Sequence, residues 1–214
     1  MNPDLSLNNI LCLITVGISV FAFSNKALQE RFLHIPYNEN HNGEKYRLLS
    51  SGFIHADFMH LLFNMIALFS FGSNVEDWFR SEDMFGSENG GIVYIIFYLV
   101  AVVAANLPTY AAHKDNISYR SLGASGATSA VIFASIIYSP MSMILMPFPM
   151  PGFVFGIFYL WYENSLSKRN NDNIAHDAHF YGALFGILFV ALFKTSALLE
   201  CFQQIVIGVQ GYFH

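Results

Sequence analysis

Five long stretches without a single Asp, Glu, Lys or Arg restrict the fold of this chain more than any other feature. They cover residues 5–25, 58–75, 89–113, 121–162 and 178–193. A helix that crosses a hydrocarbon core of roughly 30 Å needs about 20 mostly apolar residues. The 42 residues from 121 to 162 are therefore enough for two crossings. The pattern predicts an all-α polytopic membrane protein with six transmembrane helices.

The six expected spans use more than half of the chain. They cover residues 5–23, 53–75, 90–108, 123–140, 150–162 and 175–193. That leaves no room for a second soluble domain, so we expect one compact membrane domain over residues 1–195. Residues 196–214 are too polar for a seventh span and predict an amphipathic or interfacial helix. The connector over residues 24–51 is the longest, and its aromatic and aliphatic residues predict an ordered loop that packs at the membrane surface.

The charged residues also limit the possible partners. They make up 12% of the chain, against about 25% in an ordinary globular domain. The formal net charge is -5, and the ten Lys and Arg form no run, so nucleic acid is not an expected partner. Cys12 and Cys201 form neither a CxxC pair nor a disulfide framework. The lipid bilayer is the surrounding that this composition fits.

Three polar clusters stand at the starts of expected spans, where polar side chains are costly and therefore suggest function. His60 and Asn64 are four residues apart and share one helix face. Ser125 lies among glycine and alanine, which leave its hydroxyl open to a reactant. His179 begins a helix face that continues with Gly182 and Gly186. These clusters are the candidate functional residues.

Small residues predict that two of these clusters meet. Gly126, Ala130 and Ala134 recur every four residues after Ser125, and small-residue faces let two membrane helices pack closely. Packing of this face on the glycine face after His179 would bring serine beside histidine, a nucleophile beside its base. His60, Asn64 and the backbone N–H of Ser125 are the available donors for an oxyanion.

With these residues in this order, the chain resembles the rhomboid family of intramembrane serine proteases. The matching segments are Glu44-x-Tyr46-Arg47, His60 with Asn64, Gly123-x-Ser125-Gly126 and Ala178-His179-x-x-Gly182-x-x-x-Gly186. The resemblance implies a six-helix bundle and a catalytic dyad of Ser125 and His179. It also implies that His60, Asn64 and the Gly123 segment form the oxyanion and substrate-binding site. The implied substrates are transmembrane segments of other proteins, with no metal and no other cofactor.

Two positions depart from the family pattern. Tyr46 stands where the family usually has tryptophan, which keeps an amphipathic aromatic ring at the interface. Ser129 stands where many members have an aromatic residue that packs on the catalytic histidine. His179 must therefore be held in another way. Asp177 is not suited to this, because a residue two positions away points to another side of the helix.

Several other polar residues have structural interpretations. We expect Glu44 and Arg47 to fix the first loop, and Glu76 to cap or tether the end of the second span. His55 and His176 are interpreted as interfacial or structural. These assignments leave the chemistry to the three clusters above.

Three alternatives to a serine protease remain to be compared. A metalloenzyme could use some of the eight histidines, but the chain has no His-Glu-x-x-His and no adjacent histidines. A catalytically silent rhomboid-like protein that binds membrane proteins typically lacks the serine or the histidine, and both are present here. A transporter would call for internal repeats or midplane charges, and the sequence shows neither.

The expected location is a bacterial inner membrane, but the orientation in it is open. The resemblance implies a cytoplasmic N-terminus. Eight of the ten Lys and Arg would then lie in connectors on the opposite side, which is the reverse of the positive-inside rule. We follow the resemblance, because the charges of an ordered, membrane-embedded loop need not follow a rule derived from simple short loops.

Overall fold

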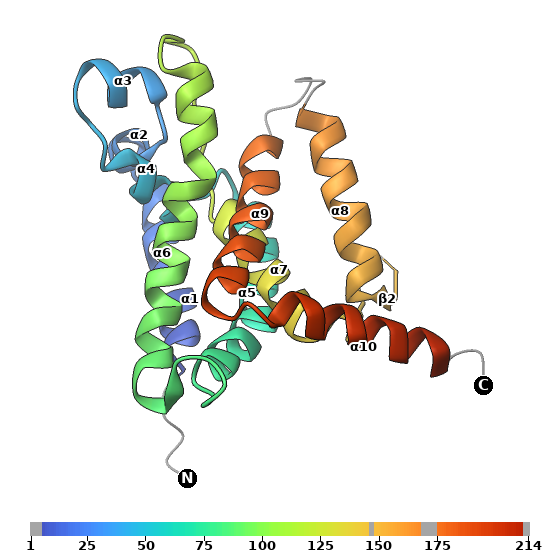
Figure 1. Ribbon diagram of the computed structural model, residues 1–214. Helices are drawn as coiled ribbons and strands as arrows, with labels where there is room; N and C mark the ends of the chain where they lie inside the picture. The colour runs from blue at the N-terminus through green and yellow to red at the C-terminus, as the bar shows by residue number, and fades with distance from the viewer. Residues whose placement is uncertain (1–5, 146–147, 168–174, 212–214) are drawn as a thin grey trace.

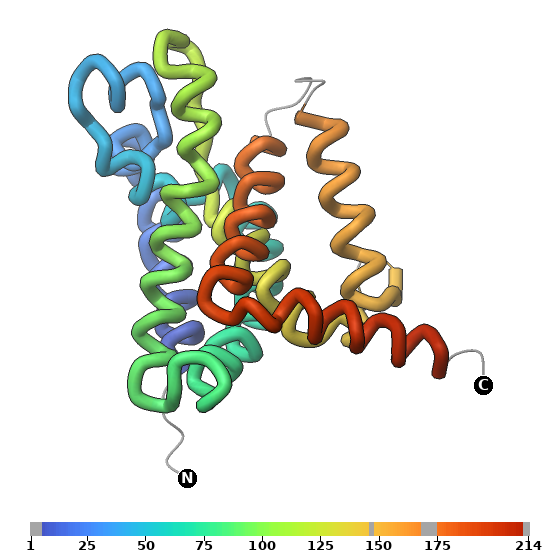
Figure 2. Tube along the Cα trace, in the orientation of Figure 1, coloured from blue at the N-terminus to red at the C-terminus, as the bar shows by residue number. Residues whose placement is uncertain are grey.

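The computed structural model describes residues 6–145, 148–167 and 175–211, and nearly all of its elements are helices (Figures 1 and 2). In chain order they are α1 (Leu7–Ser24), α2 (Lys26–Phe32), α3 (Pro36–His41), α4 (Arg47–Ser50), the 3₁₀ turn η1 (Ser51–Phe53), α5 (Phe58–Phe79), α6 (Gly86–His113), α7 (Ser125–Tyr138), β1 (Met143–Ile144), β2 (Met150–Pro151), α8 (Gly152–Ser167), α9 (His176–Phe193) and α10 (Ala197–Gly211). Leu5, where the first span is expected to start, and residues 168–174, between the expected fifth and sixth spans, lie outside the described residues.

Within the described part of the chain, four helices are long and apolar enough to cross a membrane: α1, α5, α6 and α9. The chain is thus a multi-pass integral membrane protein, but six full-length spans are not what the helix lengths support. The helix expected over 123–140 is α7, with 14 residues, or about 21 Å at 1.5 Å per residue. Residues 126–137 of α7 are all buried. A helix enclosed by protein on every side does not need to match the lipid thickness.

The fifth expected span differs in a way that matters for the site. Before the fifth helix, β1 and β2 pair antiparallel, with Met143 opposite Pro151 and Ile144 opposite Met150. The helix that follows, α8, ends at Ser167 and not at Tyr162. The sequence-based end at Tyr162 was wrong because it followed the charge-free stretch, which stops before Glu163. Instead, Glu163 is on the last part of the helix, with its side chain buried.

The expected contact of two small-residue faces is confirmed between α7 and α9. A Cβ atom added to Gly182 would collide with the backbone of Gly126, and one added to Gly186 would collide with the backbone of Ala130. The two helices therefore touch backbone to backbone, which only glycine permits at these positions. Figure 1 shows α7 in the middle of the molecule, alongside α9 and α5.

The long first connector is ordered, as expected, and folds into α2, α3 and α4 at one end of the bundle (Figure 1). Arg47 holds it together. Its Nε donates to Glu44 Oε2 at 2.5 Å, and its Nη1 donates to the carbonyl oxygens of Glu30 and Leu33 at 2.7 and 3.0 Å. This agrees with the structural interpretation of Glu44 and Arg47.

Glu76 ties α5 to the beginning of α1, as expected for a tether. Its carboxylate accepts from the backbone N–H groups of Leu7 and Asn8, at 3.1 and 2.9 Å, and from the Ser6 hydroxyl at 2.8 Å. Arg80, one turn further along α5, donates to the same carboxylate from Nε and Nη2 at 3.0 and 2.9 Å. Four donor residues therefore saturate this buried group.

Candidate active site

Ser125 is the first residue of α7, and the first connector fixes the segment that leads into it. His34 and Ser121 exchange two backbone hydrogen bonds, at 3.0 and 3.1 Å. The N–H of Gly123 donates to the Ser51 carbonyl at 2.9 Å. The three N–H groups that open a helix have no carbonyl partner within it, so α7 presents backbone donors next to the Ser125 hydroxyl.

His55 contacts the same segment directly. Its ring is fully buried, with Nε2 accepting from the Ala124 N–H at 3.3 Å and Nδ1 2.8 Å from the Ser19 hydroxyl. Ala124 directly precedes Ser125. The structural interpretation of His55 therefore agrees with its contacts.

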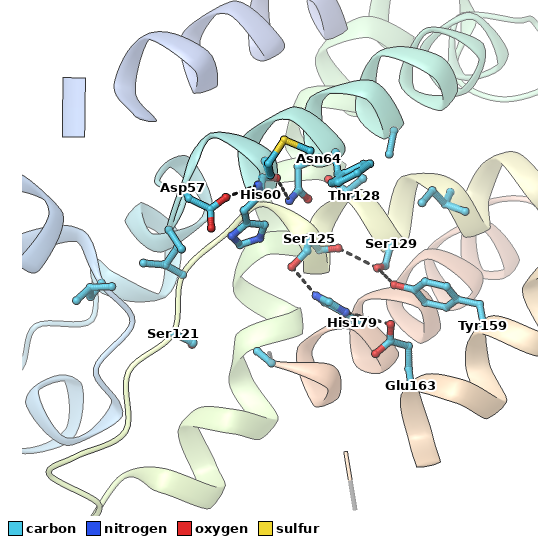
Figure 3. Close-up of a pocket in the computed structure, with 18 of the residues that line it drawn as sticks. Asp57, His60, Asn64, Ser121, Ser125, Thr128, Ser129, Tyr159, Glu163 and His179 are labelled. Atoms are coloured by element: carbon cyan, nitrogen blue, oxygen red, sulfur yellow. Dashed lines mark hydrogen bonds and ion pairs between the residues drawn. The ribbon is translucent and has the colours of Figure 1, made fainter. Parts of the chain in front are cut away.

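His179 lies one turn into α9 and faces Ser125 (Figure 3). Its Nε2 is 2.6 Å from the Ser125 Oγ. The backbone contact of α7 with α9 at Gly126 and Gly182 produces this approach. A hydroxyl hydrogen-bonded to an unprotonated imidazole nitrogen is the arrangement in which serine can lose its proton to a base.

Glu163 is the residue at this site that the sequence analysis missed. Its Oε1 is 3.2 Å from Nδ1 of His179, and its Oε2 is 2.6 Å from Nδ1 of His176. Glu163 and His176 are each 6% exposed. A signal did exist in the sequence, since Glu163 is a lone carboxylate at the end of a charge-free stretch of 42 residues, and such residues inside spans are costly.

His60 and Asn64 line the same cavity as Ser125 and His179, a space of about 740 Å³ between α5, α7, α8 and α9. The amide nitrogen of Asn64 donates to the His60 carbonyl at 2.9 Å, within α5. This is not the helix-to-helix bond of a purely structural pair. The structure therefore brings these four residues together around one cavity.

Gly123 keeps the space between His60 and Ser125 open. Its φ is +122°, a conformation that favours glycine. A Cβ atom at this position would lie 2.8 Å from Nε2 of His60 and 3.7 Å from Oγ of Ser125. The two side chains thus flank one small volume, which any larger residue would fill.

Ser129, which stands where an aromatic residue was expected from the family pattern, has a partner on α8. Its Oγ is 2.5 Å from the hydroxyl of Tyr159 and 2.8 Å from the Ser125 carbonyl. Tyr159 lies one turn before Glu163. Figure 3 shows both α8 side chains projecting into the cavity toward α7 and α9.

The same α8–α9 contact supplies a donor set that a metal could use. A carboxylate oxygen of Glu163 and one ring nitrogen each of His176 and His179 lie within 4.8 Å of one another. Zinc takes such ligands. The three groups already satisfy one another by hydrogen bonds, so a metal would have to displace the protons that these bonds require.

Comparisons with known proteins identify the family of this chain. A family model described as a Rhomboid domain matches residues 42–196. The chain is 26% identical over 185 residues to RHOMBOID-like protein 12, mitochondrial, of Arabidopsis thaliana, covering 81% of this chain and 55% of that protein. It is 27% identical over 193 residues to Rhomboid protein 1, mitochondrial, of Saccharomyces cerevisiae, covering 85% and 52%.

The chain spans about half the length of these two relatives. Both are named as mitochondrial proteins, so the comparisons do not support the expected bacterial inner membrane. The multi-pass membrane character stands on the four long apolar helices.

Proposed function

The chain belongs to the rhomboid family, and on that premise we propose that it is an intramembrane serine endopeptidase with Ser125 and His179 as its catalytic dyad. The observation that carries the proposal is the 2.6 Å separation of Ser125 Oγ and His179 Nε2 at the edge of a large cavity. Its substrates are transmembrane segments of other membrane proteins. It works within the lipid bilayer and needs no cofactor.

The chemistry begins with transfer of the Ser125 hydroxyl proton to Nε2 of His179. The serine oxygen bonds to the carbonyl carbon of the scissile peptide, whose C=O electrons move onto oxygen. Collapse of this intermediate breaks the C–N bond, and His179 returns its proton to the leaving amine. Water, activated by the same imidazole, then hydrolyses the acyl-serine ester.

His60, Asn64 and the backbone N–H of Ser125 stabilise the oxyanion. Three features support this role: the two side chains face the cavity, the Gly123 backbone leaves room beside them, and the start of a helix favours negative charge. Such donors act on the transition state more than on the bound substrate.

The position of Ser125 at the start of a helix limits what can be cut. A peptide bond within a helix is hydrogen-bonded and shielded by side chains, so a susceptible segment carries helix-weakening Gly, Pro, Ser or Asn. The residue before the cut is small, because the space beside Ser125 is bounded by Gly123 and the His60 ring.

The direct test is a reconstituted cleavage assay. Wild type, Ser125→Ala and His179→Ala are compared on one transmembrane reporter with an Ala-Ser-Gly step near its end and on a second with those residues replaced by leucine. We expect wild type to cut the first reporter only, and both variants to be inactive while still unfolding cooperatively on heating. Wild-type cleavage by either variant would remove that residue from the dyad.

The Glu163 donor set is the one observation in the described structure that favours a second function, metal-dependent hydrolysis. Inhibition of cleavage by EDTA or 1,10-phenanthroline, compared with inhibition by a serine-directed isocoumarin, distinguishes the two chemistries. A serine protease survives the chelators and is lost to the isocoumarin. Loss with a chelator and recovery with zinc would establish the metalloenzyme.

A catalytically silent membrane-protein binder is the third candidate. It would bind the reporter without cleaving it, and Ser125→Ala would change nothing. The tail over residues 196–214 is expected to be amphipathic or interfacial, and we propose that its described helix, α10, rests on the membrane surface. Leu199, Phe202 and Ile207 of α10 are exposed, and Figure 1 shows this helix lying across the end of the bundle.

A further inference from the structure

A chain of four hydrogen-bonded side chains runs from the serine hydroxyl into the protein, and Figure 3 shows its first three members, Ser125, His179 and Glu163. Ser125 Oγ is 2.6 Å from His179 Nε2, His179 Nδ1 is 3.2 Å from Glu163 Oε1, and Glu163 Oε2 is 2.6 Å from His176 Nδ1. A serine–histidine dyad requires only the first of these contacts. The carboxylate behind the base is additional.

We propose that Glu163 is the positioning residue of the base, so that the site works as a serine–histidine–glutamate triad. The proposal rests on the proposed function and deepens it. Glu163 touches no substrate and acts only through His179. Ser129 replaces the aromatic residue that packs on the histidine in many family members, and Glu163 would hold the His179 ring in its place.

The geometry explains why a carboxylate here is useful. His179 can accept the serine proton at Nε2 only if its other proton is on Nδ1, and a carboxylate that accepts from Nδ1–H selects this tautomer. Once Nε2 is protonated, the ring is an imidazolium and the same carboxylate offsets its charge. The 3.2 Å distance is at the long end of the normal range, and such contacts tighten as charge develops.

His176 fixes the other oxygen of Glu163. It lies three residues before His179 on α9, so both rings project from the same side of the helix. Because one oxygen is held at 2.6 Å by His176, the other is directed at His179. Tyr159, one turn earlier on α8, adds a second link through Ser129 on α7. The carboxylate is thus held by α8 and α9 together.

Asp177 provides a natural comparison within the same turn of α9. Its Oδ2 accepts from the Thr109 hydroxyl at 2.6 Å, and its Oδ1 accepts from the N–H of Ala178 at 3.0 Å. It is nearer to His179 in sequence than Glu163 is, but its contacts are with α6 and its own backbone. A long-range effect of any nearby carboxylate would make the two residues equivalent, whereas a positioning role belongs to Glu163 alone.

The test uses the full chain in liposomes. Glu163→Gln removes the charge and keeps the shape, Glu163→Asp keeps the charge on a shorter side chain, and Asp177→Asn is the matched control. For each we measure kcat and KM on the transmembrane reporter, the rate of labelling of Ser125 by a fluorophosphonate, and the melting temperature. Ser125→Ala gives the background of both activity measurements.

We expect Glu163→Gln to lower kcat by about 10²- to 10⁴-fold, the scale seen when the carboxylate of a triad is replaced. Labelling should slow in proportion, and KM should stay within about threefold, because substrate binding does not involve Glu163. Glu163→Asp should recover at least about tenfold of the loss but stay at least about threefold below wild type, because its shorter side chain does not reach both histidines. Asp177→Asn should turn over within about threefold of wild type.

The outcomes are distinct. Wild-type kcat and labelling in folded Glu163→Gln would overturn the positioning role while leaving the dyad intact, as would equal losses in Glu163→Gln and Asp177→Asn. If Glu163→Gln does not fold, the decision passes to Glu163→Asp, and wild-type kcat with unchanged labelling in it would count against the role. Wild-type protein that neither cleaves nor labels above the Ser125→Ala background would overturn the proposed function, and the triad with it.

Discussion

Two buried glutamates, Glu76 and Glu163, are paired in opposite ways near opposite ends of the helix bundle. Glu76 accepts from two backbone N–H groups, a hydroxyl and the guanidinium of Arg80, which stays charged at every physiological pH. Glu163 contacts two imidazoles, whose charge depends on whether a proton is present. A cavity opens next to Glu163.

The difference separates a structural carboxylate from a proposed functional one. Saturated bonds to fixed donors stabilise one arrangement and leave nothing to change during a reaction. A carboxylate whose partner can gain a proton interacts more strongly at the moment that the proton arrives. The predictions below therefore divide by readout: melting temperature at the Glu76 end, and turnover at the Glu163 end.

The largest effect on stability is expected at Glu76. Glu76→Ala removes the acceptor of Arg80 and of the N–H groups of Leu7 and Asn8, leaving several donors without their partner. Each buried donor left without its acceptor costs about 1–3 kcal/mol, seen as a lower midpoint in thermal or denaturant unfolding. Turnover per folded molecule should be unchanged. Glu82→Ala, at an exposed carboxylate nearby, is the control, and an equal loss there would erase the contrast.

The next effect is expected in turnover, at Asn64. Removing one oxyanion donor costs about 10²- to 10³-fold in kcat, and KM should barely move. Stability should change little, because the Asn64 amide bonds only to the His60 carbonyl of its own helix. Asn74→Ala is matched to it, since Asn74 makes the same kind of bond to Ser70 on the exposed side of α5. A folded Asn64→Ala protein with normal kcat would take Asn64 out of the site.

A smaller loss of turnover is expected for Gly123→Ala. The methyl group would meet the His60 ring, and a shift of a catalytic group by about 1 Å can cost about 10²-fold. Backbone strain at φ +122° adds a loss of stability of about 1–3 kcal/mol. Gly43→Ala separates the two effects, because Gly43 has φ +74° and open space around it. Both variants should melt earlier, and only Gly123→Ala should lose turnover; equal kcat in the two would contradict the steric argument.

Much of this arrangement could be predicted from the residues themselves. The charge-free stretches predict the long helices, and the small residues after Ser125 and His179 predict the contact that brings α7 to α9. His60 and Asn64 follow from their spacing on one helix. These features are local patterns, and a sequence contains local patterns directly.

What could not be predicted depends on helix ends and on pairs that are distant in sequence. The fifth span was ended at Tyr162 because Glu163 is charged, which assumed that its charge faces water. In fact two histidines from another helix contact that carboxylate at hydrogen-bond distance. The length of α7 was overestimated because hydropathy does not show that a helix is enclosed by protein. The Lys and Arg of the connectors raise a similar problem. Arg47 of the first connector is buried in a network, and Arg120 of the third connector pairs with Glu30 of the first, so their number is a poor guide to orientation.

The smallest effect is expected at Lys194, which contacts Asp83 and lies 3.0 Å from Glu200. The two carboxylates are 68% and 45% exposed, and pairs of this kind are worth at most about 1 kcal/mol. The hydrogen bond from Lys194 holds the pKa of Glu200 below its usual range. A lowered pKa in the folded state means that this contribution is complete above the ordinary pKa of glutamate, near 4.3, and disappears as pH falls through the lowered value.

Lys194→Met should therefore lower the melting temperature slightly at pH 7. The difference from wild type should shrink toward zero in acid and in about 1 M salt, where screening is strong. Thermal melts of both proteins between pH 7 and pH 3 measure this. A loss as large as that of Glu76→Ala would mean that burial does not distinguish the two carboxylate clusters. A small loss that vanishes in acid would place the stability of this end of the bundle in the buried, saturated carboxylate of Glu76.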